Sequence, residues 1–291
     1  MQIILHTGVH FTEEERLIKC IIRNREDFAK RGVGVPDPER YRKLIRDAVV
    51  AIGKTQPAPG ARDVLLDAIL EDDVSDRIIL SLPHFFGVPR YCLRNGWLYH
   101  SAASRMATIS ALFPNDEVEL FMGIRNPATF LPKVYEKTPV SGFDAFFGAS
   151  DPAQLRWSDT FKAIRTAAPK VSITTWCYED APILWPQIVR EIAALEHGQR
   201  IMGGFDLLSR IMRPEGMKRF RDYLKSHPDM PEIHKRRVMM AFLDKFADES
   251  AIEEEIDMPG WTEELIDDLS EIYEEDIFEI QRIPGVTMIA P

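Results

Sequence analysis

Short apolar runs alternate along the first part of the chain with longer stretches in which apolar residues recur every three or four positions. The runs are typical of buried strands and cover Gln2–His6, Arg77–Ser81, Glu117–Gly123 and Val171–Trp176. The longer stretches predict helices over 14–30, 38–52, 62–71, 100–112 and 154–167. Strands that alternate with helices form parallel sheets covered on both faces. The pattern therefore predicts an α/β fold with a parallel sheet flanked by helices.

The pattern becomes helical from about Pro182 onward. Helices are predicted over 183–194, 214–226, 231–246 and 261–280, with Pro and Gly between them. The chain has no internal repeat and no low-complexity linker. We therefore predict a single domain over residues 1–291, with an α/β core over 1–181 and a helical C-terminal portion over 182–291.

Charge is distributed unevenly along the chain. The net charge is -10, yet fourteen acidic residues and no Lys or Arg lie between Glu249 and Glu279, so the rest of the chain is net positive. Trp261, Leu265 and Leu269 begin an apolar helical stripe in this acidic segment, which predicts a docked helix with an acidic outer face. The one basic cluster, 234–237, has the pattern of a solvent-facing helix surface. Nucleic-acid binding is not expected, because phosphate contacts need clustered Lys and Arg.

Several other classes are disfavoured by what the sequence contains. Cys20, Cys92 and Cys177 are widely separated, so neither a disulfide framework nor a metal site is expected. No apolar run approaches the roughly 20 residues that span a bilayer, and the first residues lack a signal-peptide pattern. We expect a cytoplasmic protein without a membrane partner. The motifs of P-loop ATPases and of α/β-hydrolases are absent.

The chain begins with a strand, a tight loop and a helix start. The apolar run ends at His6, Gly8 follows in the loop, and Thr12 precedes three glutamates. A loop between a strand and a helix N-terminus is the arrangement that holds phosphate in α/β proteins. A second strand-to-helix turn, Ile124-Arg125-Asn126-Pro127, carries a cation directly after a buried strand.

These two segments resemble the phosphate-binding segments of the sulfotransferase family, in its bacterial form. The resemblance extends to Tyr178-Glu179-Asp180 and to the closing stretch 273–291. It implies a P-loop-type fold, the donor 3'-phosphoadenosine 5'-phosphosulfate (PAPS), its product adenosine 3',5'-bisphosphate (PAP), and a hydroxyl or amine acceptor on a small molecule or carbohydrate. Gly8 and Thr12 would hold the 5' side of the nucleotide.

The resemblance also marks positions where this chain differs from the family. Phe11 stands where the family has a lysine, and Glu13 where it has a glycine. Unit charges about 4 Å apart repel by roughly 4 kcal/mol at an effective dielectric near 20, so a carboxylate in the loop would weaken donor binding. Alternatively, Thr12 to Glu15 form a capping box, with Thr12 as the cap and Glu15 reaching back to it.

Arg125 and Lys133 are implied as ligands of the 3'-phosphate, with Lys133 where the family has a serine. A planar arginine fork with a lysine beside it makes a suitable anion pocket. Alternatively, Arg125 forms a structural ion pair and Lys133 is an exposed helix residue.

Sulfuryl transfer needs a base for the acceptor proton and a cation near the leaving phosphate. His84 is the first candidate base because it follows a strand end, and His10 in the first loop is the second. Either histidine could equally be a satisfied structural residue. Arg16 and Arg105 are the candidate replacements for the missing lysine.

Two hypotheses follow. In the first, the chain transfers a sulfuryl group from PAPS. In the second, it is a sulfotransferase-fold protein without transfer activity that binds a ligand or a protein. The directions of the Glu13 and Glu14 side chains distinguish them, since carboxylates that point into the cleft would exclude the donor.

Overall fold

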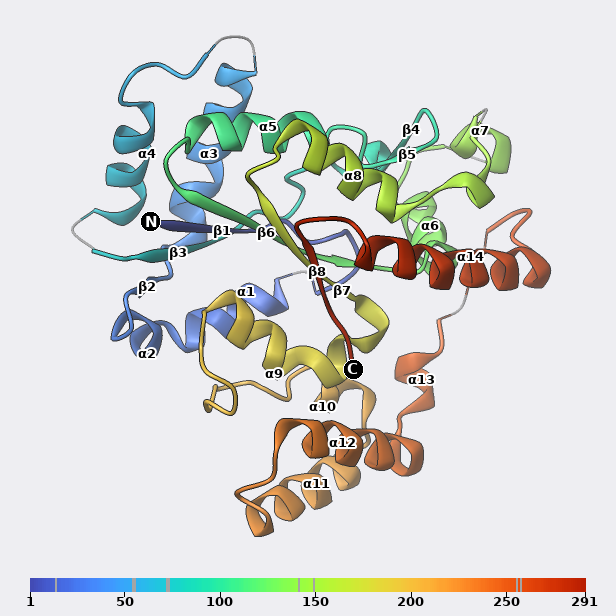
Figure 1. Ribbon diagram of the computed structural model, residues 1–291. Coiled ribbons are helices and arrows are strands. Elements are labelled where there is room, and N and C mark those ends of the chain that lie inside the picture. The colour runs from blue at the N-terminus through green and yellow to red at the C-terminus, as the bar shows by residue number, and fades with distance from the viewer. Residues whose placement is uncertain are drawn as a thin grey trace.

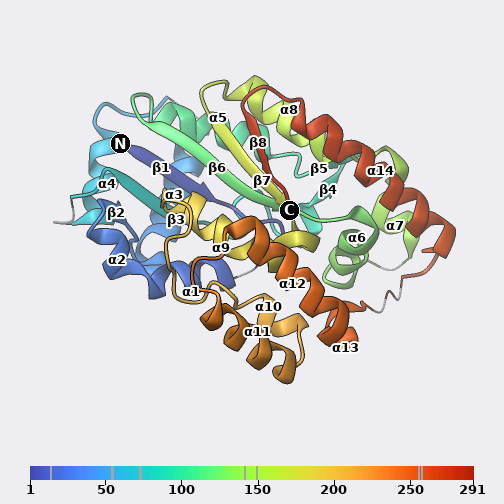
Figure 2. The same ribbon diagram turned by 60° about the horizontal axis from the view of Figure 1, so that its bottom comes forward.

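A six-stranded parallel sheet lies at the centre of the protein, with helices on both of its faces (Figure 1, Figure 2). The computed structural model describes residues 1–13, 15–53, 56–71, 74–140, 142–148, 150–254, 256 and 258–291. The sheet has the order β2-β3-β1-β6-β7-β8. Its strands are β1 (Gln2–His6), β2 (Val33–Gly34), β3 (Arg77–Ser81), β6 (Glu117–Ile124), β7 (Ser172–Cys177) and β8 (Val286–Ile289). The α/β prediction is confirmed, and each of the four predicted strands ends within one residue of the observed position.

Strand β1 occupies the middle of the sheet because it is apolar on both sides. Ile3, Ile4 and Leu5 are all buried, and they pack alternately against the two helical layers. In the register of the sheet, His6 lies opposite Ser81 of β3 and opposite Phe121 of β6. The carboxyl ends of these three strands therefore meet at one edge, where open α/β sheets bind ligands.

The larger helical layer covers one face of the sheet with its apolar stripes (Figure 1). It contains α3 (Pro38–Ile52), α4 (Ala61–Leu70), α5 (Ala102–Leu112), α6 (Pro127–Glu136), α7 (Phe143–Phe147), α8 (Trp157–Ala167) and α14 (Glu263–Gln281). A hairpin of β4 (Leu93–Arg94) and β5 (Trp97–Leu98) lies beside this layer. Short 3-10 turns cover Pro89–Tyr91, Pro152–Gln154 and Tyr178–Asp180. Side-chain caps fix several starts: Asn126 accepts from the N–H of Ala128 at α6, and Thr262 from that of Leu265 at α14.

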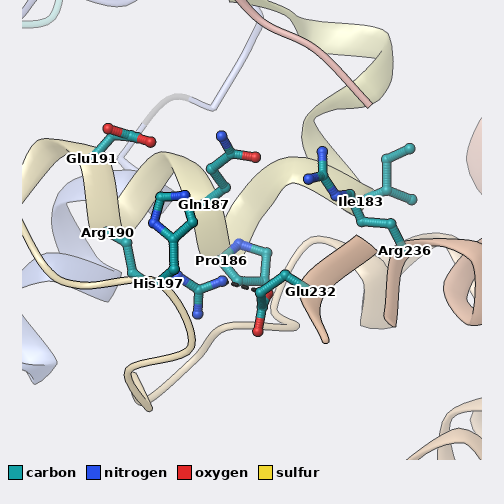
Figure 3. Close-up of a pocket in the computed structure, with 8 residues that line it drawn as sticks. All are labelled: Ile183, Pro186, Gln187, Arg190, Glu191, His197, Glu232 and Arg236. Carbon is teal, nitrogen blue, oxygen red and sulfur yellow. Dashed lines mark hydrogen bonds and ion pairs between the residues drawn. The ribbon is translucent and has the colours of Figure 1, made fainter. Parts of the chain in front are cut away.

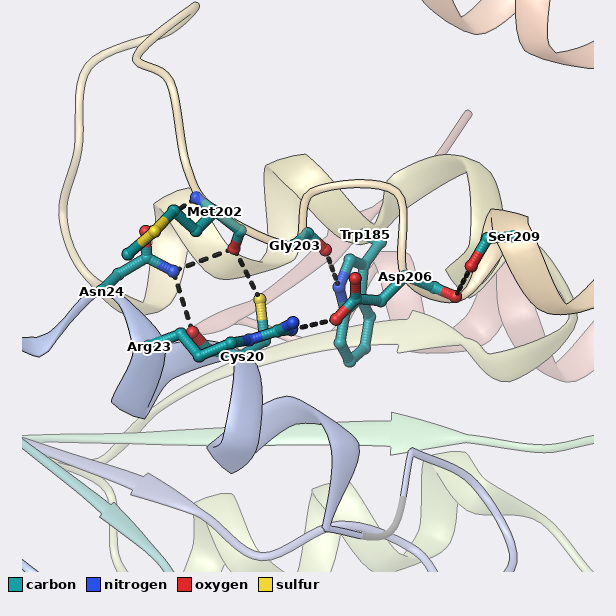
Figure 4. A network of polar contacts seen from close by, with 8 residues as sticks. All are labelled: Cys20, Arg23, Asn24, Trp185, Met202, Gly203, Asp206 and Ser209. Carbon is teal, nitrogen blue, oxygen red and sulfur yellow. Dashed lines mark hydrogen bonds and ion pairs between the residues drawn. The ribbon is translucent and has the colours of Figure 1, made fainter. Parts of the chain in front are cut away.

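The opposite face carries α1 (Arg16–Arg23), α2 (Arg25–Ala29) and α9 (Ala181–Ile192). The prediction of one helix over 14–30 is wrong, because the chain breaks at Asn24. The amide of Asn24 donates to the carbonyls of Cys20 and Met202 and accepts from the N–H of Met202 (Figure 4). A side chain that bonds backbone groups competes with helix continuation, and this contact ties α1 to the loop after α9.

A third cluster follows α9 and consists of α10 (Leu208–Ile211), α11 (Pro214–Ser226), α12 (Glu232–Phe246) and α13 (Glu249–Ile252). Its small core is centred on Phe220 and Met239. The chain then returns to the sheet through α14 and ends in β8, which pairs parallel with β7. The part after residue 182 is therefore not only helical, since β8 forms an edge strand that the sequence pattern did not predict.

Candidate functional site

Two cavities lie at the carboxyl edge of the sheet. Residues of the loop between β1 and α1 line one of them, and Arg16, where α1 begins, lines the other. The first, called here the histidine cavity, has a volume of about 320 Å³. The second, the arginine cavity, has a volume of about 600 Å³. Both volumes lie within the range of small-molecule sites. The histidine cavity is lined by, among others, His6, Thr7, Phe11, Pro83 and His84, and the arginine cavity by, among others, Arg16, Arg125, Thr129, Tyr178, Arg210 and Glu254.

The loop itself does not contain the predicted capping box. Helix α1 begins only at Arg16, and no side chain among the described residues caps it. The Thr12 hydroxyl instead donates to the carbonyl of Val9 at 2.5 Å, and Glu15 pairs with Arg42 at 3.0 Å. That prediction is therefore wrong. Gly8 has a φ of +59°, where the absence of a Cβ avoids strain, whereas Phe11 adopts a φ of +61° with a full side chain.

Glu13 points neither into a cavity nor back along the helix. Its side chain is 0% exposed, and Oε1 accepts from the indole Nε1 of Trp176 in β7. Gly123 in β6 makes room for this pair, because a Cβ there would lie 2.6 Å from Oε1. Oε2 has no hydrogen-bond partner among the described residues, and burial raises the pKa of the Glu13 carboxyl.

The raised pKa changes the charge expected in the loop. Burial shifts Glu13 towards its neutral form, and Glu15 forms an ion pair with Arg42. Glu14 lies outside the described residues. The repulsion of an anion is therefore weaker than the sequence predicts.

Arg125 is a buried cation at this edge, and several contacts fix its guanidinium group. Its side chain is 3% exposed, and its Nε donates to Thr129 at 3.0 Å. Its terminal nitrogens donate to the carbonyl of Phe11 and form an ion pair with Glu254. The guanidinium also lies 5.1 Å from the ring centroid of Tyr178. The ion-pair alternative for Arg125 is thus observed, and the same group borders the arginine cavity.

Lys133 is not among the residues that line either cavity, although it follows on the same helix. Thr129, one turn earlier in α6, contacts Arg125 instead. Sequence reasoning missed Thr129 because it counted eight residues from Arg125, whereas the helical repeat places the residue at four beside it. Of the two candidate replacements for lysine, Arg16 lines the arginine cavity and Arg105 donates to the carbonyl of Phe85.

The remaining wall of the arginine cavity mixes charges. Arg210 comes from α10, and Glu179 comes from the turn after β7. Glu179 accepts from the N–H of Asn126 at 2.8 Å and from the Tyr273 hydroxyl at 3.3 Å. Burial raises the pKa of Glu179, which favours its neutral form. With three arginines against two glutamates among its described lining residues, the cavity favours anions.

The two candidate bases lie together. Nδ1 of His84 is in hydrogen-bond contact with Nε2 of His10, and the ring centroids are 4.4 Å apart. On its other side, Nδ1 of His10 lies 2.6 Å from the Tyr99 hydroxyl and 3.2 Å from Sγ of Cys92. Burial, with the charge of His84, lowers the pKa of His10 to about 4, and burial lowers that of His84. Both rings are therefore neutral near pH 7 and able to accept a proton.

His6 and Thr7 also line the histidine cavity, and sequence reasoning missed both. Nδ1 of His6 lies 3.1 Å from Oγ of Ser81. Nε2 of His6 and Oγ1 of Thr7 are buried without a hydrogen-bond partner among the described residues. Burial, with the charge of Arg42, lowers the pKa of His6 to about 4. The only signal in the sequence was their position at the end of β1.

A further pocket lies between α9 and α12 (Figure 3). Its volume is about 40 Å³, which is room for about one water molecule. Arg190 of α9 pairs there with Glu232 of α12 at 2.6 Å. No residue of a strand end lines it, so we assign it to the packing of the two helices.

Two searches of the described residues gave no result. They contain no group of His, Cys, Asp or Glu side chains placed to hold a metal ion. Among the described helices, none has the length and apolar character needed to cross a membrane.

No protein-family model matches the chain, and no curated protein matches it significantly.

Proposed function

We propose that this chain is a sulfotransferase-like protein with a P-loop-type sheet. It takes PAPS in the arginine cavity and transfers the sulfuryl group to a hydroxyl or amine in the histidine cavity. The observation that carries this proposal is the presence of two complementary cavities at the carboxyl edge of the sheet, one lined by the loop after β1 and the other by Arg16 and Arg125. One cavity supplies the buried cation of Arg125, with Arg16 and Arg210 beside it, and the other supplies neutral bases.

The 3'-phosphate is assigned to Arg125 with Thr129 beside it. A guanidinium fork offers parallel N–H groups to phosphate oxygens, and a threonine hydroxyl adds one more donor. Lys133 remains the ligand implied by the sequence resemblance. The loop from Gly8 to Thr12 is assigned to the 5' side of the nucleotide.

His84 is assigned as the base in the transfer. It takes the proton of the acceptor group as that group's oxygen or nitrogen bonds to sulfur, while the bond from sulfur to the phosphate oxygen breaks. Arg16 replaces the missing lysine as the cation that stabilises the leaving phosphate. His10 holds His84 in position, because its Nε2 contacts Nδ1 of His84 while its Nδ1 contacts the Tyr99 hydroxyl.

Two observations favour the second candidate function, a binding module without transfer activity. Arg125 already forms an ion pair with Glu254, and Phe11 stands where the resemblance implies a lysine that would meet the sulfuryl group. Under this alternative the arginine cavity binds an anionic ligand and no bond is broken.

Calorimetric titration with PAP tests the nucleotide site. Arg125→Lys should weaken binding by about tenfold or more, because lysine cannot form the two parallel bonds of a guanidinium. Lys133→Ala tests whether Lys133 binds PAP, as the resemblance implies, although Lys133 does not line the arginine cavity. Lys137→Ala removes an exposed lysine from the end of the same helix and is the matched control. The absence of heat at millimolar PAP would exclude the proposal.

Transfer itself is tested with labelled PAPS and a panel of hydroxyl and amine acceptors. Product formation that is lost in His84→Ala, while PAP still binds, supports the transferase. PAP binding without any product would support the binding module.

A further inference from the structure

Glu254 approaches the arginine cavity from a part of the chain far from the strand ends. It follows the short helix α13, which packs against α10 (Figure 1). Ala251 and Ile252 of α13 line the cavity beside it. Glu254 is 30% exposed, whereas the Arg125 side chain that it contacts is 3% exposed. A half-buried carboxylate therefore sits at the entrance to a buried guanidinium.

The carboxylate occupies the position that an anionic ligand needs. Carboxylate and phosphate oxygens bind a guanidinium fork in the same manner. The other nitrogens of Arg125 are taken by Thr129 and by the carbonyl of Phe11, neither of which is charged. Glu254 is thus the one anionic partner of Arg125 among the described residues.

Exchange with Glu254 discriminates between ligands by charge. A monocarboxylate that displaces Glu254 replaces one unit charge with another and gains little. A phosphate with about two negative charges gains additional attraction from Arg16 and Arg210, which line the same cavity.

We propose that Glu254 is a built-in competitor that closes the arginine cavity to weak anions and reserves it for ligands with a phosphate dianion. The proposal rests on the proposed function in one respect, which is that the arginine cavity is a ligand site. It requires neither a nucleotide nor a transfer step.

The competition weakens the apparent affinity of the cavity for phosphate. The apparent affinity equals the intrinsic affinity multiplied by the fraction of molecules in which Arg125 is not paired with Glu254. If Glu254 holds Arg125 in about 90 to 99% of molecules, its removal tightens phosphate binding by roughly 10- to 100-fold. A substitution that keeps the shape and removes the charge isolates this effect.

Inorganic pyrophosphate is the probe, titrated by calorimetry into the full chain and into Glu254→Gln. We expect binding to tighten about tenfold or more in E254Q. The neighbouring Glu253→Gln is the matched control, because it removes an equal charge from an exposed side chain and should leave affinity within about twofold. Thermal unfolding of each variant checks that the fold persists, and Glu254→Ala provides a second variant.

Equal affinity in the wild type and E254Q would overturn the competition, and so would equal tightening in E253Q. Failure of pyrophosphate to bind either protein would also overturn it. The proposed function fails separately, when pyrophosphate binds but PAP binds no better than pyrophosphate. A parallel titration with acetate should give no heat in the wild type, and acetate binding as strong as that of pyrophosphate would contradict the charge selection.

Discussion

The two cavities beside the loop differ in how their polar groups are satisfied. In the arginine cavity, Arg125 forms an ion pair with Glu254 of the same chain and donates a hydrogen bond to the carbonyl of Phe11. In the histidine cavity, Nε2 of His6 and Oγ1 of Thr7 are buried without partners among the described residues. One site must therefore exchange an internal partner for a ligand, whereas the other has hydrogen-bonding capacity to offer directly. The difference fits our proposal of an anionic ligand in the arginine cavity and an uncharged acceptor in the histidine cavity.

The largest effect is expected at the buried contact that holds the loop after β1, between Glu13 and Trp176. Gly123→Ala places a Cβ 2.6 Å from Oε1 of Glu13 and 2.8 Å from Nε1 of Trp176. Both side chains are fully buried, so the variant should lose about 3 kcal/mol of unfolding free energy. Denaturant titration measures this loss.

Gly204→Ala is the control for that substitution. Its nearest neighbour is the side chain of Ile201 at 3.2 Å, which can move, and the expected loss is below about 1 kcal/mol. Equal losses in the two variants would show that Glu13 is not tightly held.

Acid should distinguish the histidine cavity from the arginine cavity. In the folded protein the pKa of His6 is lowered from 6.5 to about 4. Between pH 6.5 and 4, His6 is therefore protonated in the unfolded chain but largely neutral in the folded protein. His6 therefore removes stability as the pH falls from 6.5 towards 4, by about 2.5 kcal/mol at pH 4.5. His6→Asn should reduce the loss of unfolding free energy between pH 7 and 4.5 by about that amount.

His227 is exposed, and His227→Asn serves as the comparison. A pH profile that is as steep in His6→Asn as in the wild type would refute the assignment of a buried neutral imidazole to His6.

The smallest effect is expected at the loop's exposed end. Glu15 and Arg42 are both partly exposed, and such pairs contribute about 0.5 kcal/mol. Glu15→Gln should therefore change the unfolding free energy by no more than about 0.5 kcal/mol, and the change should shrink in 0.5 M salt. A loss of more than about 1 kcal/mol that persists in salt would contradict the assignment of Glu15 to an exposed ion pair with Arg42.

The core strands and long helices were predictable because their periodicity is local. The helices Pro38–Ile52 and Pro214–Ser226 coincide with their predicted ranges. The edge strands Val33–Gly34 and Val286–Ile289 were missed, since two to four residues carry no clear period. Short strands are defined by the neighbour with which they pair.

The site was predictable in its position but not in its contacts. A parallel sheet was expected, and in it the ends of β1, β3 and β6 meet at the carboxyl edge. The capping box failed because Glu15 pairs with Arg42, 27 residues away, and Glu13 between its two members bonds Trp176, 163 residues away. Likewise, Glu254 lies 129 residues from Arg125, and no local pattern encodes such a pair. Contacts over these separations depend on the whole fold.

The Asn24 contact has a geometric consequence for the arginine cavity. One amide joins α1, which begins with Arg16, to the loop that leads to α10, which contains Arg210. The backbone segments that carry these two arginines are therefore joined by a contact at the far end of α1, outside the cavity. A substitution at Asn24 thus acts on two of the arginines that line the cavity without touching the cavity itself.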